Sequence, residues 1–199
     1  QHSQSLHAWF SHIPGLKVAV PSTPYDAKGL LKAAIRDDNP VVFFEDKMMY
    51  QMKGPVPEQE YTILLGQADV KRAGTDITLV GTSSMVHVAL RAAEILTQSG
   101  INAEVVDVRT TFPLDKRTLV DSAKKTTRAI VIDEGYERFG VTAEIASVIA
   151  EGAFYYLDAP VKRMGAMDVP VPFSPVLEDL TVPTPESVAK IAKELCGKK

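Results

Sequence analysis

This sequence of 199 residues has a single cysteine, no excess of basic residues and no long apolar run. A single cysteine, Cys196, can form neither an internal disulfide nor a cysteine-based metal site, which is typical of a reducing compartment. No run of about 18 apolar residues and no charged leader ahead of an apolar stretch is present, so we expect neither a membrane span nor a signal peptide. The 22 Lys and Arg against 25 Asp and Glu give a net charge of −3, which argues against a nucleic-acid-binding protein.

The sequence also lacks the short motifs that identify many enzymes. It contains no G-x-G-x-x-G after a strand, no P-loop, no H-E-x-x-H and no G-x-S-x-G. A nucleotide-binding enzyme complete in itself is therefore not supported. With 45% hydrophobic and 24% charged residues, the composition is that of an ordinary folded protein, not of a disordered or fibrous one.

Residues 1–46 predict half of an α/β domain. Helical and strand-like stretches alternate there, at 6–13, 16–20, 24–37 and 40–45. Two strands are too few for a parallel sheet that is covered on both faces. Because the chain also opens on Gln1 and not on Met, we expect this segment to be the second half of a domain. Residues 47–61 combine Met, Pro and charged residues without a sustained period and predict a linker.

Residues 62–199 predict a second α/β domain without internal repeats. Expected strands lie at 76–80, 103–108, 129–133 and 161–164. Expected helices lie at 84–98, 115–124, 141–151 and 186–195. This alternation predicts a mainly parallel sheet covered by helices on both faces. Function is then expected in the loops at the carboxyl ends of the strands, which are 81–83, 109–113 and 134–138.

Four histidines are candidate proton-transfer groups, because the unperturbed pKa of histidine lies near 6.5. We expect His7 and His87 to lie on the solvated faces of their helices. His12 is expected to complement the charge at the end of a helix. His2 stands in a polar Gln-His-Ser-Gln-Ser cluster, where a capping or loop role and a catalytic role both remain open.

Two acidic segments allow a functional and a purely structural interpretation. The turn after residue 34 ends a helix, so carbonyl oxygens and acidic side chains converge there and could hold a hard cation; a plain solvated helix stop is the alternative. Glu134 and Glu137 follow an apolar strand and could act as paired carboxylates, but nothing in the sequence raises the pKa of either, so a solvated loop is favoured.

Several ordered segments of the sequence resemble one enzyme family. They are QHSQSLHAWFSHIPGLKVAVPSTPYDAKGLLKAAIRDDNPVVFFE, DVRTTFPLD, FGVTAEI and LDAPVKRMGAMDVPVPFSPVLED. They resemble the beta subunit of the thiamine-diphosphate-dependent decarboxylase component of 2-oxo acid dehydrogenase complexes. STPYDAKGLL and FFEDKMMYQMKG look most like the acetoin and pyruvate dehydrogenase types, and DEGYERFG more like the pyruvate type, so the substrate stays open.

The resemblance implies the domain organisation. It predicts the C-terminal half of a transketolase-type pyrimidine-binding domain at 1–46, a linker at 47–61, and a three-layer α/β/α transketolase C-terminal domain at 62–199. In the family, the glutamate that activates the cofactor lies in the part that this chain lacks, and the alpha subunit holds the diphosphate and Mg²⁺ of thiamine diphosphate. We therefore expect the chain alone to be inactive.

The resemblance also assigns roles to particular residues. His2 matches the active-site histidine of the HSQ motif, near the thiazolium, where it would assist substrate binding or proton transfer. Asp158, in LDAP, matches a position implicated in docking on the acyltransferase core. A structural potassium ion is implied at the turn after the helix at 24–37, where the matching positions are Ala34, Ile35, Asp37 and Asn39.

The implied activity is cleavage of a 2-oxo acid or of acetoin with reductive acyl transfer to a lipoyl group. The implied partners are an alpha subunit in an alpha2beta2 heterotetramer and a dihydrolipoyl acyltransferase core, with a small-molecule substrate and no nucleic acid or membrane. The implied location is the bacterial cytoplasm or the mitochondrial matrix. The alternative is a non-catalytic module for oligomerisation and core docking. A single-chain transketolase or deoxyxylulose phosphate synthase is a third option, against which the LDAP segment argues.

Overall fold

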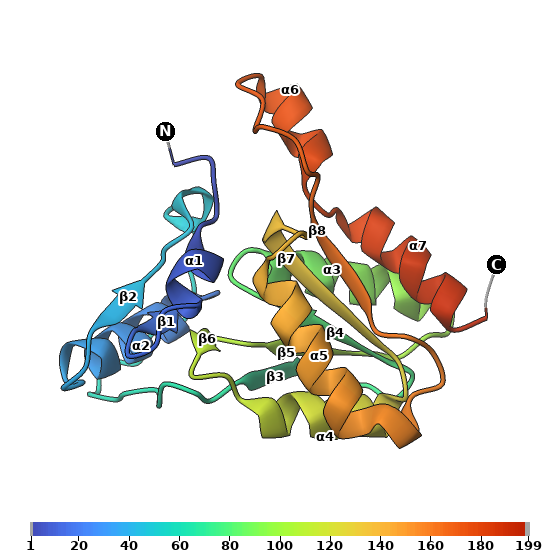
Figure 1. Cartoon of the computed structure of the whole chain (residues 1–199), viewed down its shortest axis with the longest axis horizontal. Helices are drawn as coiled ribbons and strands as arrows, with labels where there is room; N and C mark the ends of the chain where they lie inside the picture. The colour runs from blue at the N-terminus through green and yellow to red at the C-terminus, as the bar shows by residue number, and fades with distance from the viewer. Residues whose placement is uncertain (1, 198–199) are drawn as a thin grey trace.

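Two β-sheets organise the chain (Figure 1), and the computed structural model describes residues 2–197 of it. The small sheet has the order β2-β1-β6, in which β1 and β2 are parallel and β6 runs antiparallel to β1. Its strands are β1 (Lys17–Ala19), β2 (Val41–Phe43) and β6 (Thr110–Phe112). The third strand therefore comes from a segment about 70 residues further along the chain than β2 and gives β1 a partner on each side.

The large sheet has the order β3-β5-β4-β7-β8. Four of its strands are parallel, and β3 pairs antiparallel at one edge. The strands are β3 (Asp69–Arg72), β4 (Ile77–Gly81), β5 (Ala103–Asp107), β7 (Ala129–Tyr136) and β8 (Lys162–Ala166). All five residues of β4 and of β5 are buried, as expected for central strands with helices on both faces.

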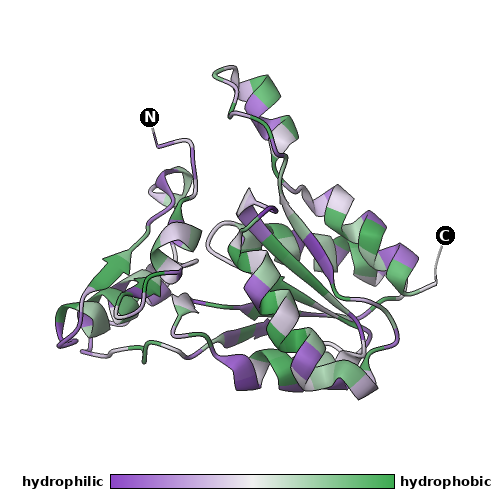
Figure 2. Ribbon diagram, in the orientation of Figure 1, coloured by the Kyte–Doolittle hydropathy of each residue, from purple (hydrophilic) through white to green (hydrophobic). Residues whose placement is uncertain are grey.

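Helices cover both faces of the large sheet. On one face lie α3 (Met85–Gln98) and α7 (Pro185–Leu195), and on the other lie α4 (Lys116–Thr126) and α5 (Val141–Ala153). Successive strand residues point to opposite faces, so Leu79 joins the first core and Val80 the second. The central strands in Figure 2 are largely green because of this double burial, and polar residues such as Glu104 interrupt the colour. The expected three-layer α/β/α arrangement is confirmed.

The remaining helices are short or lie beside the small sheet. They are α1 (His7–Ser11), α2 (Pro24–Ile35), α6 (Pro175–Glu178) and the 3₁₀ turns η1 (Lys47–Met49), η2 (Phe154–Tyr156) and η3 (Asp179–Thr181). The Thr23 side chain caps α2 by accepting the backbone N–H of Asp26. Figure 1 shows α6 on an arm that projects from the body of the molecule. No helix within residues 2–197 has both the length and the apolar character needed to cross a bilayer.

Three segments differ from the prediction. β7 continues through Tyr136, so Glu134 lies in a strand and not in the expected loop. The expected loop at 109–113 contains β6, and β3 was not predicted. Both missed strands have half-polar sequences and are defined by antiparallel pairing with strands far away in the sequence, which local patterns do not encode. The domain limits at 46 and 61 stay a prediction.

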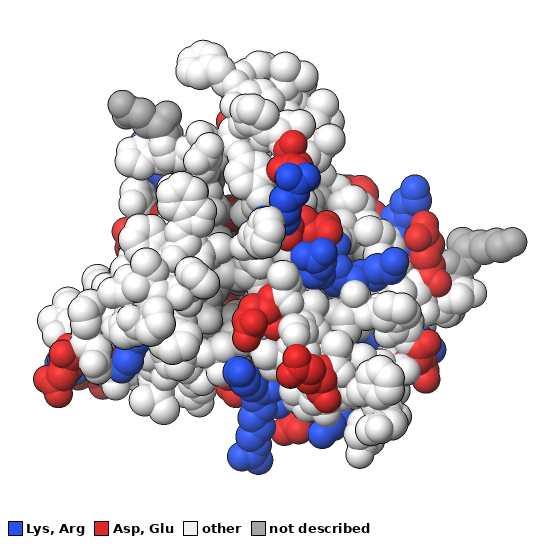
Figure 3. All heavy atoms as spheres, in the orientation of Figure 1, with Lys and Arg blue, Asp and Glu red and all other residues white. Residues whose placement is uncertain are grey.

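Charges of both signs lie beside each other on the face shown in Figure 3, without an extended area of one sign. Several of the exposed charges are paired. Arg138 contacts Asp168, and Arg163 contacts Glu137 at 3.3 Å. Such exposed pairs contribute little to stability, about 0–1 kcal/mol each.

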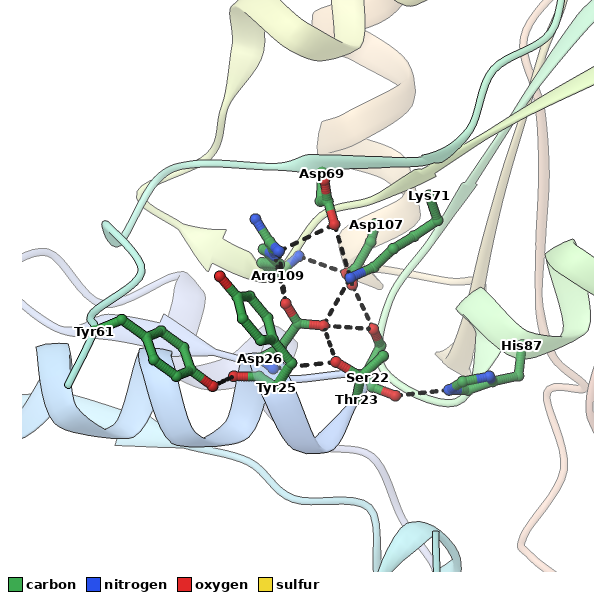
Figure 4. Close-up of polar contacts among 10 residues, drawn as sticks. All are labelled: Ser22, Thr23, Tyr25, Asp26, Tyr61, Asp69, Lys71, His87, Asp107 and Arg109. Carbon is green, nitrogen blue, oxygen red and sulfur yellow. Dashed lines mark hydrogen bonds and ion pairs between the residues drawn. The ribbon is translucent and has the colours of Figure 1, made fainter. Parts of the chain in front are cut away.

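A buried ionic cluster joins the two sheets (Figure 4). Asp26, on α2, is fully buried and receives the guanidinium of Arg109 at 2.7 Å and the ammonium of Lys71 at 2.8 Å. Arg109 and Lys71 also contact Asp69, at 3.0 and 2.8 Å. Asp107, at the end of β5, lies 3.4 Å from Lys71 and accepts the backbone N–H of Arg109. The cluster therefore fixes α2, beside the small sheet, to β3 and β5 of the large sheet.

The two buried carboxylates of this cluster have opposite pKa shifts. Burial would raise the pKa of Asp26, but hydrogen bonds from Lys71 and Thr23 and the charges of Lys71 and Arg109 bring it below its ordinary value. Burial raises the pKa of Asp107 to about 6, and the nearby charge of Asp26 adds to this effect against the opposing contribution of Lys71. Asp26 therefore stabilises the fold as an anion, whereas ionisation of Asp107 costs stability.

This difference predicts how Asp107→Asn changes the pH dependence of unfolding. Between pH 4 and 7 the unfolded state releases the Asp107 proton before the native state does, so the wild type loses stability through this group as the pH rises. The variant lacks that loss. Its free energy of unfolding relative to wild type should rise by on the order of 1–3 kcal/mol over this range, measured by urea unfolding.

The matched control is Asp121→Asn, which removes an exposed carboxylate paired with Arg117 on α4. The difference between its free energy of unfolding and that of wild type should stay nearly constant over the same pH range. A difference for Asp107→Asn that is equally flat would contradict the pKa assigned to Asp107.

Candidate functional site

A cavity of about 350 Å³ lies at the carboxyl ends of strands from both sheets. The chain reaches it directly after β1, β2 and β4, and at Glu134 within β7. Binding sites of parallel α/β sheets occur at this edge. Its lining comes from the amino-terminal segment, the ends of these strands and the turn after β2: His2, Gln4, Ser5, His7, Val20, Phe44, Glu45, Asp46, Lys47, Tyr50, Ser83 and Glu134.

His7 is buried at this cavity and pairs with Asp133. Its Nε2 lies 3.0 Å from Oδ2 of Asp133, and Asp133 also accepts the Thr82 hydroxyl and the Gly135 backbone N–H. Burial alone would lower the pKa of His7, but the charge and hydrogen bond of Asp133 outweigh it and raise the pKa above its ordinary value. The pKa of Asp133 lies below its ordinary value, since His7, Thr82 and Gly135 outweigh burial. The expectation of a solvated His7 is wrong.

Glu134 extends from the next position of β7 and holds two serine hydroxyls. Ser5 donates to Oε1 at 2.5 Å, and Ser84 donates to Oε2 at 2.6 Å. Burial raises the pKa of Glu134; the two serines oppose this shift, and the charges of Asp46 and Asp133 add to it. The expected solvated loop is therefore wrong for Glu134, although Glu137 is exposed as expected.

His2 lies in the lining of the same cavity with an exposed side chain. Its φ of 63° is in the left-handed region, which residues other than glycine seldom adopt. The cavity thus brings together an exposed imidazole and a carboxyl group with a raised pKa, the two kinds of side chain most used for proton transfer. Its other charged lining residues are Glu45, Asp46 and Lys47, so the lining is acidic overall.

The other two histidines lie away from this arrangement. His12 follows the end of α1, where it is exposed and its N–H donates to the Ala8 carbonyl, in agreement with a helix-terminal position. The prediction that His87 lies on a solvated helix face is wrong. Its Nε2 lies 2.6 Å from the Ser22 carbonyl oxygen, so it contributes to the contact between α3 and the start of α2 (Figure 4).

The predicted cation site lies at the end of α2. The Asp37 carboxylate accepts Lys17 at 2.5 Å and both the backbone and side-chain N–H groups of Asn39, and these bonds lower its pKa to about 2. The Ala34 carbonyl accepts the Asp37 N–H at 3.3 Å. Lys17 thus already neutralises the Asp37 side chain. The main-chain carbonyl oxygens are the remaining ligand atoms for an ion. No cluster of three or more His, Cys, Asp or Glu suited to a metal occurs among residues 2–197.

Asp158 lies in the turn between η2 and β8. Its carboxylate accepts the Thr127 hydroxyl at 2.7 Å and contacts Arg128 at 3.0 Å, while the side chain stays 55% exposed. It borders a groove of about 790 Å³ along α5 whose lining is mostly apolar. The aromatic side chains of η2 lie next to this groove along the chain and are exposed: Phe154, Tyr155 and Tyr156.

The predicted site residues therefore occupy three separate places. The structure brings His2 together with three residues that the sequence did not assign to a site: His7, Asp133 and Glu134. One signal for the two acids was present, because they directly follow the apolar run 129–132 in the parallel strand β7. No local signal identifies His7, whose partner is 126 residues away.

Comparisons with known proteins assign the two parts of the chain to known domain families. The transketolase pyrimidine-binding domain matches residues 1–53, and the transketolase C-terminal domain matches residues 66–188. A solved chain described as a split-gene transketolase, inactive beta4 tetramer, superposes with a TM-score of 0.75 at 25% identity, over 97% of this chain and 61% of that one.

Curated relatives are similar along almost the whole sequence. The acetoin:2,6-dichlorophenolindophenol oxidoreductase subunit beta of Bacillus subtilis is 54% identical over 99% of this chain. The 2-oxoisovalerate dehydrogenase subunit beta of Bacillus subtilis and the mitochondrial pyruvate dehydrogenase E1 component subunit beta-1 of Oryza sativa are 46% and 44% identical over 98% of it.

The chain spans 58%, 60% and 54% of the length of these three relatives. The predicted fold class agrees with the strand order, the helix layers and both matched models. The match over residues 66–188 covers more than half of the sequence. This chain is therefore a member of the transketolase C-terminal domain family that carries, ahead of that domain, a segment of the transketolase pyrimidine-binding type.

Proposed function

We propose that this chain serves in the beta subunit of a thiamine-diphosphate-dependent dehydrogenase that acts on a 2-oxo acid or on acetoin. The observation that carries the proposal is the cavity at the carboxyl ends of strands from both sheets, whose lining includes His2 of the HSQ motif and Glu134. The 54% identity with an acetoin oxidoreductase beta subunit supports it. Pyruvate, acetoin and branched-chain 2-oxo acids all remain candidate substrates, because relatives of all three types are similar.

The charges of the cavity fit one end of thiamine diphosphate and not the other. Glu45, Asp46 and Glu134 outnumber Lys47, so the lining favours the cationic thiazolium and disfavours the diphosphate. We therefore assign the diphosphate and its Mg²⁺ to an alpha-type partner subunit. When bound, thiamine diphosphate supplies the electron sink for carbon–carbon bond cleavage.

In this proposal His2 transfers a proton or anchors the substrate at the mouth of the cavity. Its side chain is exposed there, so it is accessible to a small molecule. His7 lies deeper and is occupied by Asp133, which makes it a structural group. Relatives named as mitochondrial and bacterial proteins support a location in the mitochondrial matrix or the bacterial cytoplasm.

The activity is tested with His2→Ala in the protein that carries this sequence, assembled with an alpha-type subunit. Turnover on pyruvate or acetoin should fall about 100-fold or more, because proton-transfer groups contribute rate factors of that size. The affinity for thiamine diphosphate, measured by calorimetry, should stay nearly unchanged. His12→Ala is the control, since His12 is exposed outside this cavity. Wild-type turnover of His2→Ala would refute the role of His2.

We also propose a potassium ion at the end of α2, held by the main-chain carbonyls of Ala34, Ile35, Asp37 and Asn39. Neutral carbonyl oxygens are typical ligands of K⁺, and the pairing of Asp37 with Lys17 leaves these carbonyls as the donors. An ion that binds the native state raises the unfolding temperature. Unfolding in K⁺ should occur about 2–4 °C above unfolding in Na⁺ or tetramethylammonium at equal ionic strength. Equal midpoints in the three salts would argue against the site.

Asp158 and the adjoining groove form the proposed docking surface for a dihydrolipoyl acyltransferase core. The exposed aromatic residues of η2 and the half-exposed carboxylate offer an apolar surface with one charged anchor. Asp158→Asn should weaken binding to the acyltransferase about ten-fold, or 1.4 kcal/mol, by calorimetry. Glu151→Gln, which removes another exposed carboxylate from the end of α5, is the control. Unchanged affinity of Asp158→Asn would remove Asp158 from the docking surface.

A further inference from the structure

Two adjacent acids of β7 attach the amino-terminal segment to the large sheet. Asp133 binds His7 of α1, and Glu134 binds Ser5 in the segment just before α1. Among the described residues, the Ser5 hydroxyl makes the one side-chain hydrogen bond that ties residues 2–6 to the large sheet. The place of His2 at the cavity therefore depends on a contact three residues away from it.

The backbone at the end of β7 is shaped for this contact. A Cβ on Gly135 would lie 2.7 Å from Oδ2 of Asp133 and 3.4 Å from the Ser5 carbonyl oxygen. A side chain at position 135 would thus displace the Asp133 carboxylate, whereas the Ser5 carbonyl oxygen would remain at an ordinary contact distance. The glycine therefore leaves Asp133 free to hold His7, next to the contact between Glu134 and Ser5.

We propose that Glu134 is a positioning residue that sets the place of His2 through Ser5, and that it does so as a carboxylate that accepts the hydroxyls of Ser5 and Ser84 together. This inference rests on the proposed role of His2. A carboxylate accepts two hydroxyls at once, at the 2.5–2.7 Å typical of charge-assisted bonds, as observed here. A protonated carboxyl group makes one oxygen a donor and a weaker acceptor, so the serine contact to that oxygen reverses or weakens.

The surroundings move this change toward higher pH than for an ordinary glutamate. Burial raises the pKa of Glu134, and Asp46 and Asp133 add to that shift, while Ser5 and Ser84 oppose it. His7, on α1, offsets the charge of Asp133. The other titratable or charged groups that line the cavity with Glu134 are His2 from the amino-terminal segment and Glu45, Lys47 and Tyr50 from the segment after β2.

A first experiment measures the attachment itself. Hydrogen–deuterium exchange of the peptide covering residues 2–11 is compared between wild type, Ser5→Ala and Ser5→Thr. Ser5→Ala should speed exchange of this peptide about ten-fold or more, and Ser5→Thr, which keeps a hydroxyl, should restore protection. Ser147→Ala, which removes an exposed hydroxyl on α5, is the control. Unchanged exchange in Ser5→Ala would overturn the proposal.

A second experiment measures the consequence for turnover in the assembly with the alpha-type subunit. Ser5→Ala should lower kcat about 10- to 100-fold with little change in KM, because the reacting groups are misplaced and the binding contacts stay. Ser84→Ala removes a donor that lowers the pKa of Glu134, so the acid limb of the pH–kcat profile should move up by roughly one unit. An acid limb that stays in place in Ser84→Ala would overturn the proposal, since a purely structural loss would lower kcat equally at every pH.

The two failures are distinguishable. If His2→Ala keeps wild-type turnover, the proposed role of His2 fails, and the exchange experiment still decides whether Glu134 holds the segment. If His2→Ala is inactive while Ser5→Ala matches wild type in exchange and in kcat, the proposed function stands and the positioning role of Glu134 falls.

Discussion

Buried opposite charges hold the two sheets in one arrangement, and the cavity at their shared edge depends on it. Asp26 on α2 is fully buried and pairs with Arg109, which follows β5, and with Lys71 of β3. An ion pair of this kind contributes little net stability, but removal of one partner leaves an uncompensated buried charge that costs about 3–5 kcal/mol. The cluster therefore selects the orientation of α2 relative to β5 more than it strengthens the fold, and the cavity lies where strand ends of the two sheets meet.

Much of the large sheet could be predicted from the sequence because its signals are local. The apolar strands and the glycine at position 100, just after α3, set the element limits to within a few residues. β3 and β6 could not be predicted in this way. Thr110 and Thr111 in β6 are buried by pairing with β1, and nothing within the segment itself indicates that partner.

The candidate site was predictable only where a motif identifies it. His2 was recognised through the HSQ pattern, whereas His7 was assigned to a solvated face by helical periodicity. That periodicity describes a helix in isolation, and His7 is buried by Asp133 from a distant strand. The sequence gives no sign of the raised pKa of Glu134, because that shift comes mainly from burial in the folded chain. The contacts of His7 with Asp133 and of Ser5 with Glu134 thus join segments that are far apart in the sequence, and local sequence patterns do not reveal them.

The crossing of β6 into the small sheet has a consequence for how this chain can be divided. In the sequence β6 lies among the strands of the large sheet, but it pairs with β1 of the small sheet. Arg109, next to β6, carries the ionic contact with Asp26. A cut anywhere in 47–61 would leave two polypeptides that still share one sheet. Segments exchanged between relatives at a point within 47–61 would bring together a β1 and a β6 that had not been selected for each other. In this protein, therefore, a segment that is continuous in the sequence does not coincide with a set of strands that pack together.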